Sequence, residues 1–135
     1  MIEYKLSPRF NDTDCLGHIN NASIATWFEE GRKEIFKFFV PDLSPKEWNL
    51  IVARTEIDYL AQGHYQHDVV IKSAIEKIGN SSFTVAQECH QNGTIVAKGK
   101  AILVYFDYGL NKANPIPTEV KDKLAKHLLS DGAAL

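Results

Sequence analysis

Residues 21–39 carry a helical repeat that the flanking segments do not share. Apolar side chains fill the positions between a spaced set of polar ones, namely Thr26, Glu29, Glu30, Lys33, Glu34 and Lys37. At about 100° per residue this spacing predicts an amphipathic helix, which Pro41 ends. Its apolar face must be buried against another layer of structure.

Two residues are unusual on the apolar side of this helix. Gly31 costs about 1 kcal/mol relative to alanine, and we attribute it to close approach between the helix and a sheet. Arg32 projects from the apolar face. We expect its guanidinium to extend to solvent, or to pair with a carboxylate or with carbonyls at a strand end. Its predicted role is therefore structural.

Five segments outside the helix have the alternating pattern of β-strands, at residues 2–10, 50–60, 68–78, 82–90 and 94–108. Asn92-Gly93 predicts a tight hairpin between the last two, and we expect Gly99 to bend or bulge the long final strand. In the segment 50–60, alternation predicts that five side chains share one face of the strand: Ile51, Ala53, Thr55, Ile57 and Tyr59. Residues 117–129 predict a short terminal helix.

The order strand, long helix, four strands, terminal helix predicts an α+β fold with a mostly antiparallel five-stranded sheet and one apolar helix lying across it. We expect a single domain spanning residues 1–135. One helix covers only part of such a sheet, so the uncovered edge or face should pair with another copy. The sequence thus predicts a homo-oligomer.

Charge and composition argue against several classes of protein. The formal net charge of -2 gives no reason to expect nucleic acid or an anionic membrane as partner. No window has the length and apolarity of a signal peptide or a membrane span. Cys15 and Cys89 fit no Cys-x-x-Cys motif. We expect a soluble cytoplasmic protein with reduced thiols.

The stretch "DTDCLGHINN", residues 12–21, holds more polar groups than a helix cap needs. In the simplest interpretation, Asn20 or Asn21 caps the helix while Asp12 and Asp14 are solvated loop residues. Alternatively, the free N–H groups at the helix start bind an oxyanion, and Asp14 activates water or attacks a carbonyl. That interpretation predicts an acyl-transfer site without a metal.

Other polar groups leave further alternatives. Cys15 with His18 would form a thiolate nucleophile, although a plain small residue is the simpler interpretation. His64 and His67 would supply two metal ligands, but two imidazoles without a third ligand are usually a polar loop. A basic set suits either a solvated sheet face or a phosphate-bearing substrate: Arg54, Lys72, Lys77, Lys98 and Lys100.

Three stretches resemble a known family: "RFNDTDCLGHINNASIATWFEEGR", "VARTEIDYL" and "IEKIGNSSFTVAQECHQNGTIVAKGKAILVYFD". They look like the 4-hydroxybenzoyl-CoA thioesterase-like branch of hotdog-fold acyl-CoA thioester hydrolases, over most of residues 2–108. The resemblance implies a hotdog fold, in which the sheet wraps the long helix and dimers join sheets edge to edge. It also implies hydrolysis of an acyl thioester of coenzyme A (CoA) or acyl carrier protein, without metal or organic cofactor.

The resemblance also implies roles for single residues. Asp14 would be the catalytic carboxylate, as general base or nucleophile, and His18 would stand beside the thioester. Gly17 would permit the tight approach of the substrate. The helix start would be shaped by Asn20 and Asn21, and backbone N–H groups around Ala22 and Ser23 would polarise the carbonyl. The expected assembly is a homodimer or a homotetramer.

Two departures from the family pattern bear on the substrate. Many relatives carry a tyrosine where this chain has Ile24, and a basic residue with proline where this chain has "AQGHYQHD". Apolar residues such as Trp27, Phe28 and Tyr59 line either an acyl tunnel or the core. A non-hydrolytic module that binds acyl thioesters or assembles with a partner is the alternative function. A dehydratase ranks last, because the polar helix face carries no histidine.

Overall fold

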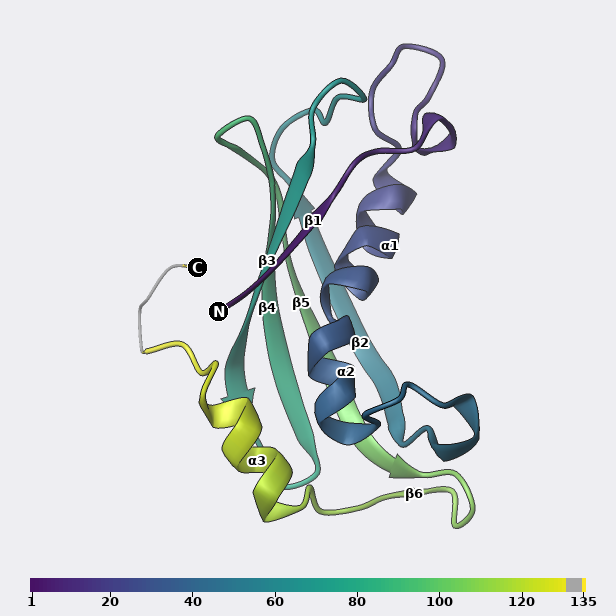
Figure 1. Cartoon of the computed structure of the whole chain (residues 1–135), viewed down its shortest axis with the longest axis vertical. Coiled ribbons are helices and arrows are strands. Elements are labelled where there is room, and N and C mark those ends of the chain that lie inside the picture. Colours follow the sequence, from purple (N-terminus) through teal and green to yellow (C-terminus); the bar gives the residue numbers. More distant parts are fainter. Residues whose placement is uncertain (131–134) are drawn as a thin grey trace.

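The computed structural model describes residues 1–130 and residue 135, and its main element is a curved antiparallel sheet (Figure 1). The strands lie in the order β1-β3-β4-β5-β2. Their bounds are β1 Ile2–Leu6, β2 Leu50–Tyr59, β3 Val69–Ile78, β4 Ser82–Gln91 and β5 Thr94–Asp107, with a short β6, Lys112–Ala113, beside β5. All five predicted strands are confirmed, with their ends moved by a few residues.

The helices cover one face of this sheet. α1 (Asn21–Gly31) and α2 (Lys33–Phe39) follow one another along it, and α3 (Thr118–Ala125) packs against α2 and β3 (Figure 1). Short 3-10 turns, Phe10–Asp12 and Pro45–Glu47, lie before α1 and after α2. The predicted α+β arrangement of a sheet, a long central helical segment and a short terminal helix is confirmed.

Two clusters of buried apolar side chains fill the space between the helices and the sheet. The cluster beneath α1 includes Trp27 and Phe28, which are 4% and 2% exposed. The cluster beneath α2 and α3 includes Phe39, Phe83 and Leu124. Each such side chain stabilises the fold by about 1.5–3 kcal/mol through burial. Trp27 and Phe28 are therefore core residues.

The helical segment is interrupted at Arg32. The Arg32 N–H donates to the carbonyl oxygens of both Phe28 (3.2 Å) and Glu29 (3.0 Å), as at the last turn of a helix. Side chains from the sheet approach the same turn. Gln87 Nε2 donates to the Phe28 carbonyl at 2.8 Å, and the Ser73 hydroxyl donates to the Gly31 carbonyl at 3.3 Å. The Gly31 carbonyl accepts the Ser73 hydroxyl, and the Ile35 N–H, which would bond to Gly31 in a continuous helix, instead donates to the Arg32 carbonyl at 2.9 Å, so α1 ends and α2 begins here.

Arg32 is buried, contrary to the expectation that it extends to solvent or pairs with a carboxylate. It is 5% exposed, and its Nη1 donates to Gln87 Oε1 at 3.0 Å. Among the described residues, its Nε has no acceptor. Burial lowers the pKa of Arg32 from its ordinary value, yet a guanidinium stays charged in proteins. An amide in the middle of β4 therefore holds a buried cation, and this supports the structural role.

A bulge in β2 changes which of its residues face the helices. Val52 pairs with Leu103 and Arg54 pairs with Ile102, so Ala53 is the extra residue. Paired residues of antiparallel strands share a face. The predicted face, with Ile51 and Ala53, is therefore wrong at the start of the strand. The observed set on the helix side is Leu50, Val52, Thr55, Ile57 and Tyr59.

Gly99 lies in a regular part of β5, so the predicted bend is wrong. It pairs with Gln87 of β4 and Ile57 of β2, and the β4–β5 irregularity occurs elsewhere, next to Cys89. A Cβ at position 99 would lie 2.8 Å from Cε2 of Phe28. The glycine is needed because an aromatic ring of α1 rests against the strand.

Replacing Gly31 by alanine is expected to destabilise the protein by about 1–3 kcal/mol, the usual range for an overpacked core. The added Cβ would lie 2.5 Å from Cγ2 of Ile71 on β3. At an open helical position the same change would stabilise the protein by about 1 kcal/mol. The sign of the change in the free energy of unfolding therefore shows whether the helix packs closely on the sheet at Gly31. Urea unfolding measures it, and a stabilised variant would contradict the close helix–sheet approach.

Candidate active site

The residues before α1 form a closed loop. The Asn20 N–H donates to the Asp12 carbonyl at 2.7 Å, and inside this pair the Asp14 N–H donates to the His18 carbonyl at 2.8 Å. Gly17, with a φ of 80°, supplies the left-handed backbone conformation that the turn requires. Residues 14–18 are therefore held next to the start of α1.

Asp14 is exposed, and the loop itself orients its carboxylate. Oδ1 accepts the backbone N–H of Leu16 at 2.8 Å and of His18 at 3.1 Å. Oδ2 accepts no hydrogen bond from any residue that the structure describes. One oxygen thus fixes the direction of the group while the other is free to take a proton or attack a carbonyl.

Asp12, only two residues away, is buried and has a different environment. Its Oδ2 accepts the Arg9 N–H at 2.7 Å, and its Oδ1 lies 3.4 Å from Arg9 Nη2. Burial by itself raises the pKa of Asp12, but hydrogen bonds from Arg9 and from the Ser23 hydroxyl outweigh it and leave the pKa below 3.8. The interpretation of Asp12 as a solvated loop residue is therefore wrong, and Asp12 anchors the loop.

Asp12→Asn is expected to lower the free energy of unfolding by about 1 kcal/mol at neutral pH, since Arg9 is largely exposed and its pairing is screened. The pKa of Asp12 is lower in the folded than in the unfolded protein, so this stabilisation is complete above the unfolded value of 3.8. It is lost as the pH falls through the folded value. Urea unfolding at several pH values should show the two proteins converging below about pH 4. A difference that persists unchanged in acid would contradict this assignment.

Asn20 caps α1 and occupies two of its first amides. Its Oδ1 accepts the Ala22 N–H at 2.9 Å, and its carbonyl accepts the Ser23 N–H at 3.0 Å. These are the amides that the family resemblance places on the substrate carbonyl. The Asn21 N–H, by contrast, has no acceptor in the described part of the chain. It is the free donor at the positive end of the helix.

A cavity of about 340 Å³ lies beside this free amide. It is lined by Ile19, Asn21, Ile24, Tyr59, Leu60, Ala61, Gln62 and Gly63. The Tyr59 hydroxyl is 3.5 Å from the Asn21 carbonyl. Trp27, Phe28 and Tyr59 were the residues assigned either to an acyl tunnel or to the core. Of these three, Tyr59 lines the cavity at the start of α1. Ile24, where many relatives have tyrosine, is 2% exposed and packs in the core.

Gln91, which no sequence motif indicated, holds the chain that follows Gly63 and lines a neighbouring cavity with His64 and His67. Gln91 is buried; its Oε1 accepts the His64 N–H at 2.8 Å, and its Nε2 donates to the carbonyls of His64 (2.8 Å) and His67 (2.9 Å). The Ile19 N–H donates to the Gly63 carbonyl at 2.9 Å. A single glutamine near a hairpin turn belongs to no motif. The sequence feature that could have pointed to Gln91 is the loop "AQGHYQHD", which departs from the family pattern and contains the residues that Gln91 binds.

His18 lies where the loop before α1 meets the loop between β2 and β3, and it forms an isolated β-bridge with His64. Its ring is half-buried and makes an edge contact with the ring of His64, with 5.5 Å between centroids, and His64 in turn touches His67 at 6.2 Å. Within residues 1–130 and 135, no group of three or more His, Cys, Asp or Glu side chains is arranged to hold a metal ion. Asp14 and His18 thus lie on the loop that leads into α1, whose first residue is Asn21.

Neither cysteine thiol is placed to act as a nucleophile beside a histidine. Cys15 is exposed, and no hydrogen bond joins it to His18 among the described residues. Cys89 is buried beneath α1, and burial raises the pKa of its thiol to about 12, so it stays protonated. Of the helices that the structure describes, none has the length and apolarity to cross a membrane.

A family model of the thioesterase-like superfamily matches residues 8–124. This chain belongs to that superfamily. The match includes the loop with Asp14, the central helices and all of β2 to β5. The family expected from the motif around Gly17 is therefore confirmed.

Solved structures confirm the hotdog fold. A protein named a predicted thioesterase from Bacillus stearothermophilus is 44% identical, with a TM-score of 0.94 over 97% of this chain and 98% of that one. A thioesterase from Thermus thermophilus, solved with coenzyme A and Zn, is 28% identical, with a TM-score of 0.82 over 91% and 96%. Among curated proteins, the uncharacterized protein YsmA of Bacillus subtilis (strain 168) is 35% identical over 81 residues, which cover 60% of this chain and 55% of that protein.

Proposed function

We propose that this protein hydrolyses acyl-CoA thioesters, releasing a carboxylic acid and CoA, in a single catalytic domain formed by residues 1–135. The observations that carry the proposal are that the loop before α1 orients the Asp14 carboxylate, and that the N–H of Asn21, the first residue of α1, has no acceptor among the described residues. Membership of the thioesterase-like superfamily and the CoA bound in a relative support the substrate class.

In this proposal the thioester carbonyl sits in the cavity beside Asn21. The Asn21 N–H and the positive end of α1 stabilise the oxyanion that forms on the carbonyl oxygen. Removing one such donor typically costs about 10²–10³ in turnover. Asn20, Ala22 and Ser23 act indirectly, because their mutual hydrogen bonds fix the helix start and so the direction of the Asn21 N–H.

Asp14 supplies the other half of the chemistry. As general base, its free Oδ2 takes a proton from water while the water oxygen bonds to the thioester carbon. The tetrahedral intermediate then collapses, the C–S bond breaks, and the thiolate receives the proton from Asp14. As nucleophile, Oδ2 would attack the carbon directly, expel the thiolate and leave an anhydride that water hydrolyses. In single-turnover hydrolysis in H₂¹⁸O, label in Asp14 identifies the nucleophilic route, because water that attacks the Asp14 carbonyl of the anhydride leaves its oxygen in that carboxylate.

His18 and Gly17 are proposed to complete the wall nearest the thioester. The His18 ring has no hydrogen-bond partner among the described residues and is braced by His64, so it is available to donate to the substrate. At Gly17 no atom of the described residues lies within 4 Å of where a Cβ would be, so the substrate can approach the backbone there. No metal or organic cofactor enters this mechanism, and we expect the enzyme to work in the cytoplasm.

The proposal is tested with a panel of acyl-CoAs and a thiol-reactive chromophore that reports free CoA. We expect thiol release with at least one acyl group at a rate that depends on enzyme concentration. Thermal stabilisation by acyl-CoA without any thiol release would instead identify a module that binds acyl thioesters without hydrolysis. Parallel assays with acyl carrier protein thioesters identify the carrier.

A further inference from the structure

Backbone contacts join the loop before α1 to the loop between β2 and β3. The Ile19 N–H donates to the Gly63 carbonyl at 2.9 Å, and next to this hydrogen bond His18 and His64 form an isolated antiparallel β-bridge. The two loops are thus paired as a short ladder, in which each backbone holds the other in place. A shift of the second loop would therefore move His18.

His18 in turn orients the proposed catalytic carboxylate. The His18 N–H donates to Asp14 Oδ1 at 3.1 Å, and the His18 carbonyl accepts the Asp14 N–H at 2.8 Å. The ring of His64 also rests against the ring of His18, with 5.5 Å between centroids. The direction of the Asp14 carboxylate thus depends on where the second loop holds His18.

Gln91, the last residue of β4, fixes the second loop. Its side chain is buried and makes three hydrogen bonds to the backbone of that loop. It accepts the His64 N–H at 2.8 Å and donates to the carbonyls of His64 at 2.8 Å and His67 at 2.9 Å. Without this amide, these backbone groups would lose their partners and would have to move to find others.

We propose that Gln91 is a positioning residue for thioester hydrolysis, which orients Asp14 through the paired loops. This inference rests on the proposed function and adds a residue from the β4–β5 hairpin to its machinery. Gln91 does not line the cavity beside Asn21; it lines a neighbouring cavity of about 310 Å³. Its effect on the reaction therefore passes through the loops.

Gln91→Leu tests the proposal in the full chain, because leucine has a similar volume and makes none of the three hydrogen bonds. We expect kcat for the best acyl-CoA of the panel to fall about 10–100-fold, since a misplacement of about 1 Å costs up to about 10²-fold. KM should change much less, because Gln91 contacts no part of the proposed carbonyl site. The assay is run below the unfolding midpoint of every variant.

Gln87→Leu is the matched control. It makes the same substitution on the same strand and also removes three hydrogen bonds of a buried glutamine, but these go to Arg32, Phe28 and Ser73. We expect the control to keep the wild-type kcat. An equal loss of kcat in the two variants would overturn the inference, because a general loss of packing would then explain it.

Combining Gln91→Leu with Asp14→Asn shows whether the loss passes through the carboxylate. Residues that act as a unit in catalysis have strongly non-additive effects. We therefore expect the double variant to be no slower than Asp14→Asn alone. If Gln91→Leu lowers kcat as much in the Asp14→Asn background as in wild type, Gln91 acts on something other than Asp14 and the inference is wrong.

The amide protons of Leu16 and His18 report the same link without an assay, because both N–H groups donate to Asp14 Oδ1. In Gln91→Leu we expect their NMR signals to move upfield and their exchange with solvent to become faster. In Gln87→Leu both signals should keep their wild-type positions. A geometry change confined to the Asp14 loop is what a positioning role requires.

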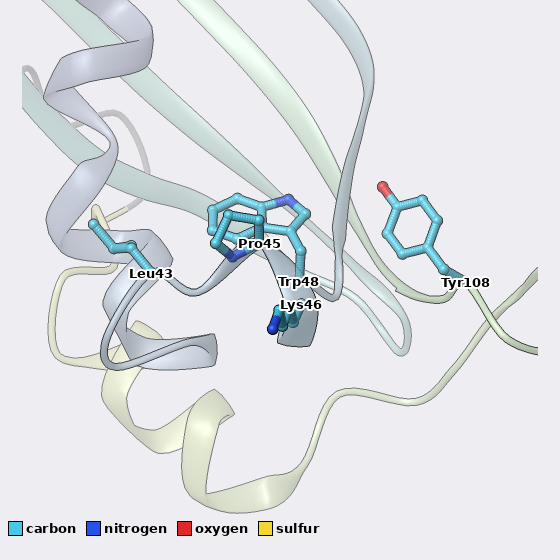
Figure 2. Close-up of a pocket in the computed structure, with 5 residues that line it drawn as sticks. All are labelled: Leu43, Pro45, Lys46, Trp48 and Tyr108. Carbon is cyan, nitrogen blue, oxygen red and sulfur yellow. The ribbon is translucent and has the colours of Figure 1, made fainter.

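Trp48 checks that Gln91→Leu acts locally. It precedes β2 at the end of the sheet opposite Gln91, beside a hollow of about 500 Å³. Figure 2 shows Trp48 with Pro45 on one side of this hollow and Tyr108 across it. Tryptophan emission of Gln91→Leu should match that of the wild type. A shift to longer wavelength would indicate a general loss of packing and would overturn a local role.

Gly63→Ala displaces the same loop without removing a hydrogen-bonding group. Its Cβ would lie 3.0 Å from Ile19 Cβ and 3.4 Å from Gln91 Oε1, so the signals of Leu16 and His18 should move in this variant as well. Unmoved signals in both variants would overturn the link to Asp14. A wild-type protein that releases no thiol from any acyl-CoA would instead refute the proposed function, and the amide signals would still test the link.

Discussion

Asp14→Asn is expected to reduce acyl-CoA turnover by about 10²–10⁴-fold, the range for loss of a general base, while fold and assembly persist. The asparagine keeps an Oδ1 acceptor for the N–H groups of Leu16 and His18, so the loop before α1 retains its shape. What is lost is the negative charge on the oxygen that the loop leaves free. The measurement is kcat/KM with the best acyl-CoA of the panel, together with the unfolding midpoint.

Asp12→Asn is the matched control for this experiment. It removes a carboxylate two residues away in the same loop, but one that is buried against Arg9 and Ser23. We expect the two variants to behave oppositely: Asp14→Asn loses activity at constant stability, and Asp12→Asn loses stability with a much smaller change in activity. Near-normal turnover by Asp14→Asn would remove the carboxylate from the mechanism.

Gln87→Leu is expected to destabilise the protein by about 3 kcal/mol, because it strips a buried guanidinium of its acceptor. Gln87 accepts from Arg32, and its amide also donates to the Phe28 carbonyl and to the Ser73 hydroxyl at 2.9 Å. Leucine has a similar volume and offers none of these hydrogen bonds. Chemical unfolding measures the free energy of unfolding, and the effect should appear without any change in the Asp14 loop.

A double-mutant cycle with Arg32→Met identifies the cause of that loss. If the cost of Gln87→Leu comes from an unpaired buried charge, Arg32→Met in the same chain should recover most of it, since an apolar pair of similar volume replaces a buried polar one. Additive losses in the double variant would show that Arg32 does not depend on Gln87. A loss below about 1 kcal/mol for Gln87→Leu alone would mean that Arg32 finds another acceptor.

Local patterns in the sequence predicted the parts of the fold that depend on near neighbours. The helical repeat over residues 21–39, the alternating strands and the Asn92-Gly93 turn were recognisable because period and turn chemistry act over a few residues. Both turn residues have positive φ, 48° and 78°, as expected for that hairpin. The motif around Gly17 also indicated the family, which residues 8–124 match.

The distinction between Asp12 and Asp14 came from the tertiary structure. The two residues are chemically identical and almost adjacent, yet one is 2% exposed and paired with Arg9 while the other faces solvent. Burial depends on what α1 and the chain before it place over each side chain, and no local pattern contains that information. The same holds for Gln91, whose three hydrogen bonds go to a loop more than twenty residues earlier.

The sequence by itself therefore determined the kinds of elements, their order and the loop that carries the candidate chemistry. The tertiary structure decided the bulge at Ala53, the close contacts of Gly31 and Gly99, and which amide at the start of α1 remains free. Each of these depends on atoms from strands distant in the chain. Periodicity encodes which side of an element is buried, whereas register and packing are fixed only when the partner element is in place.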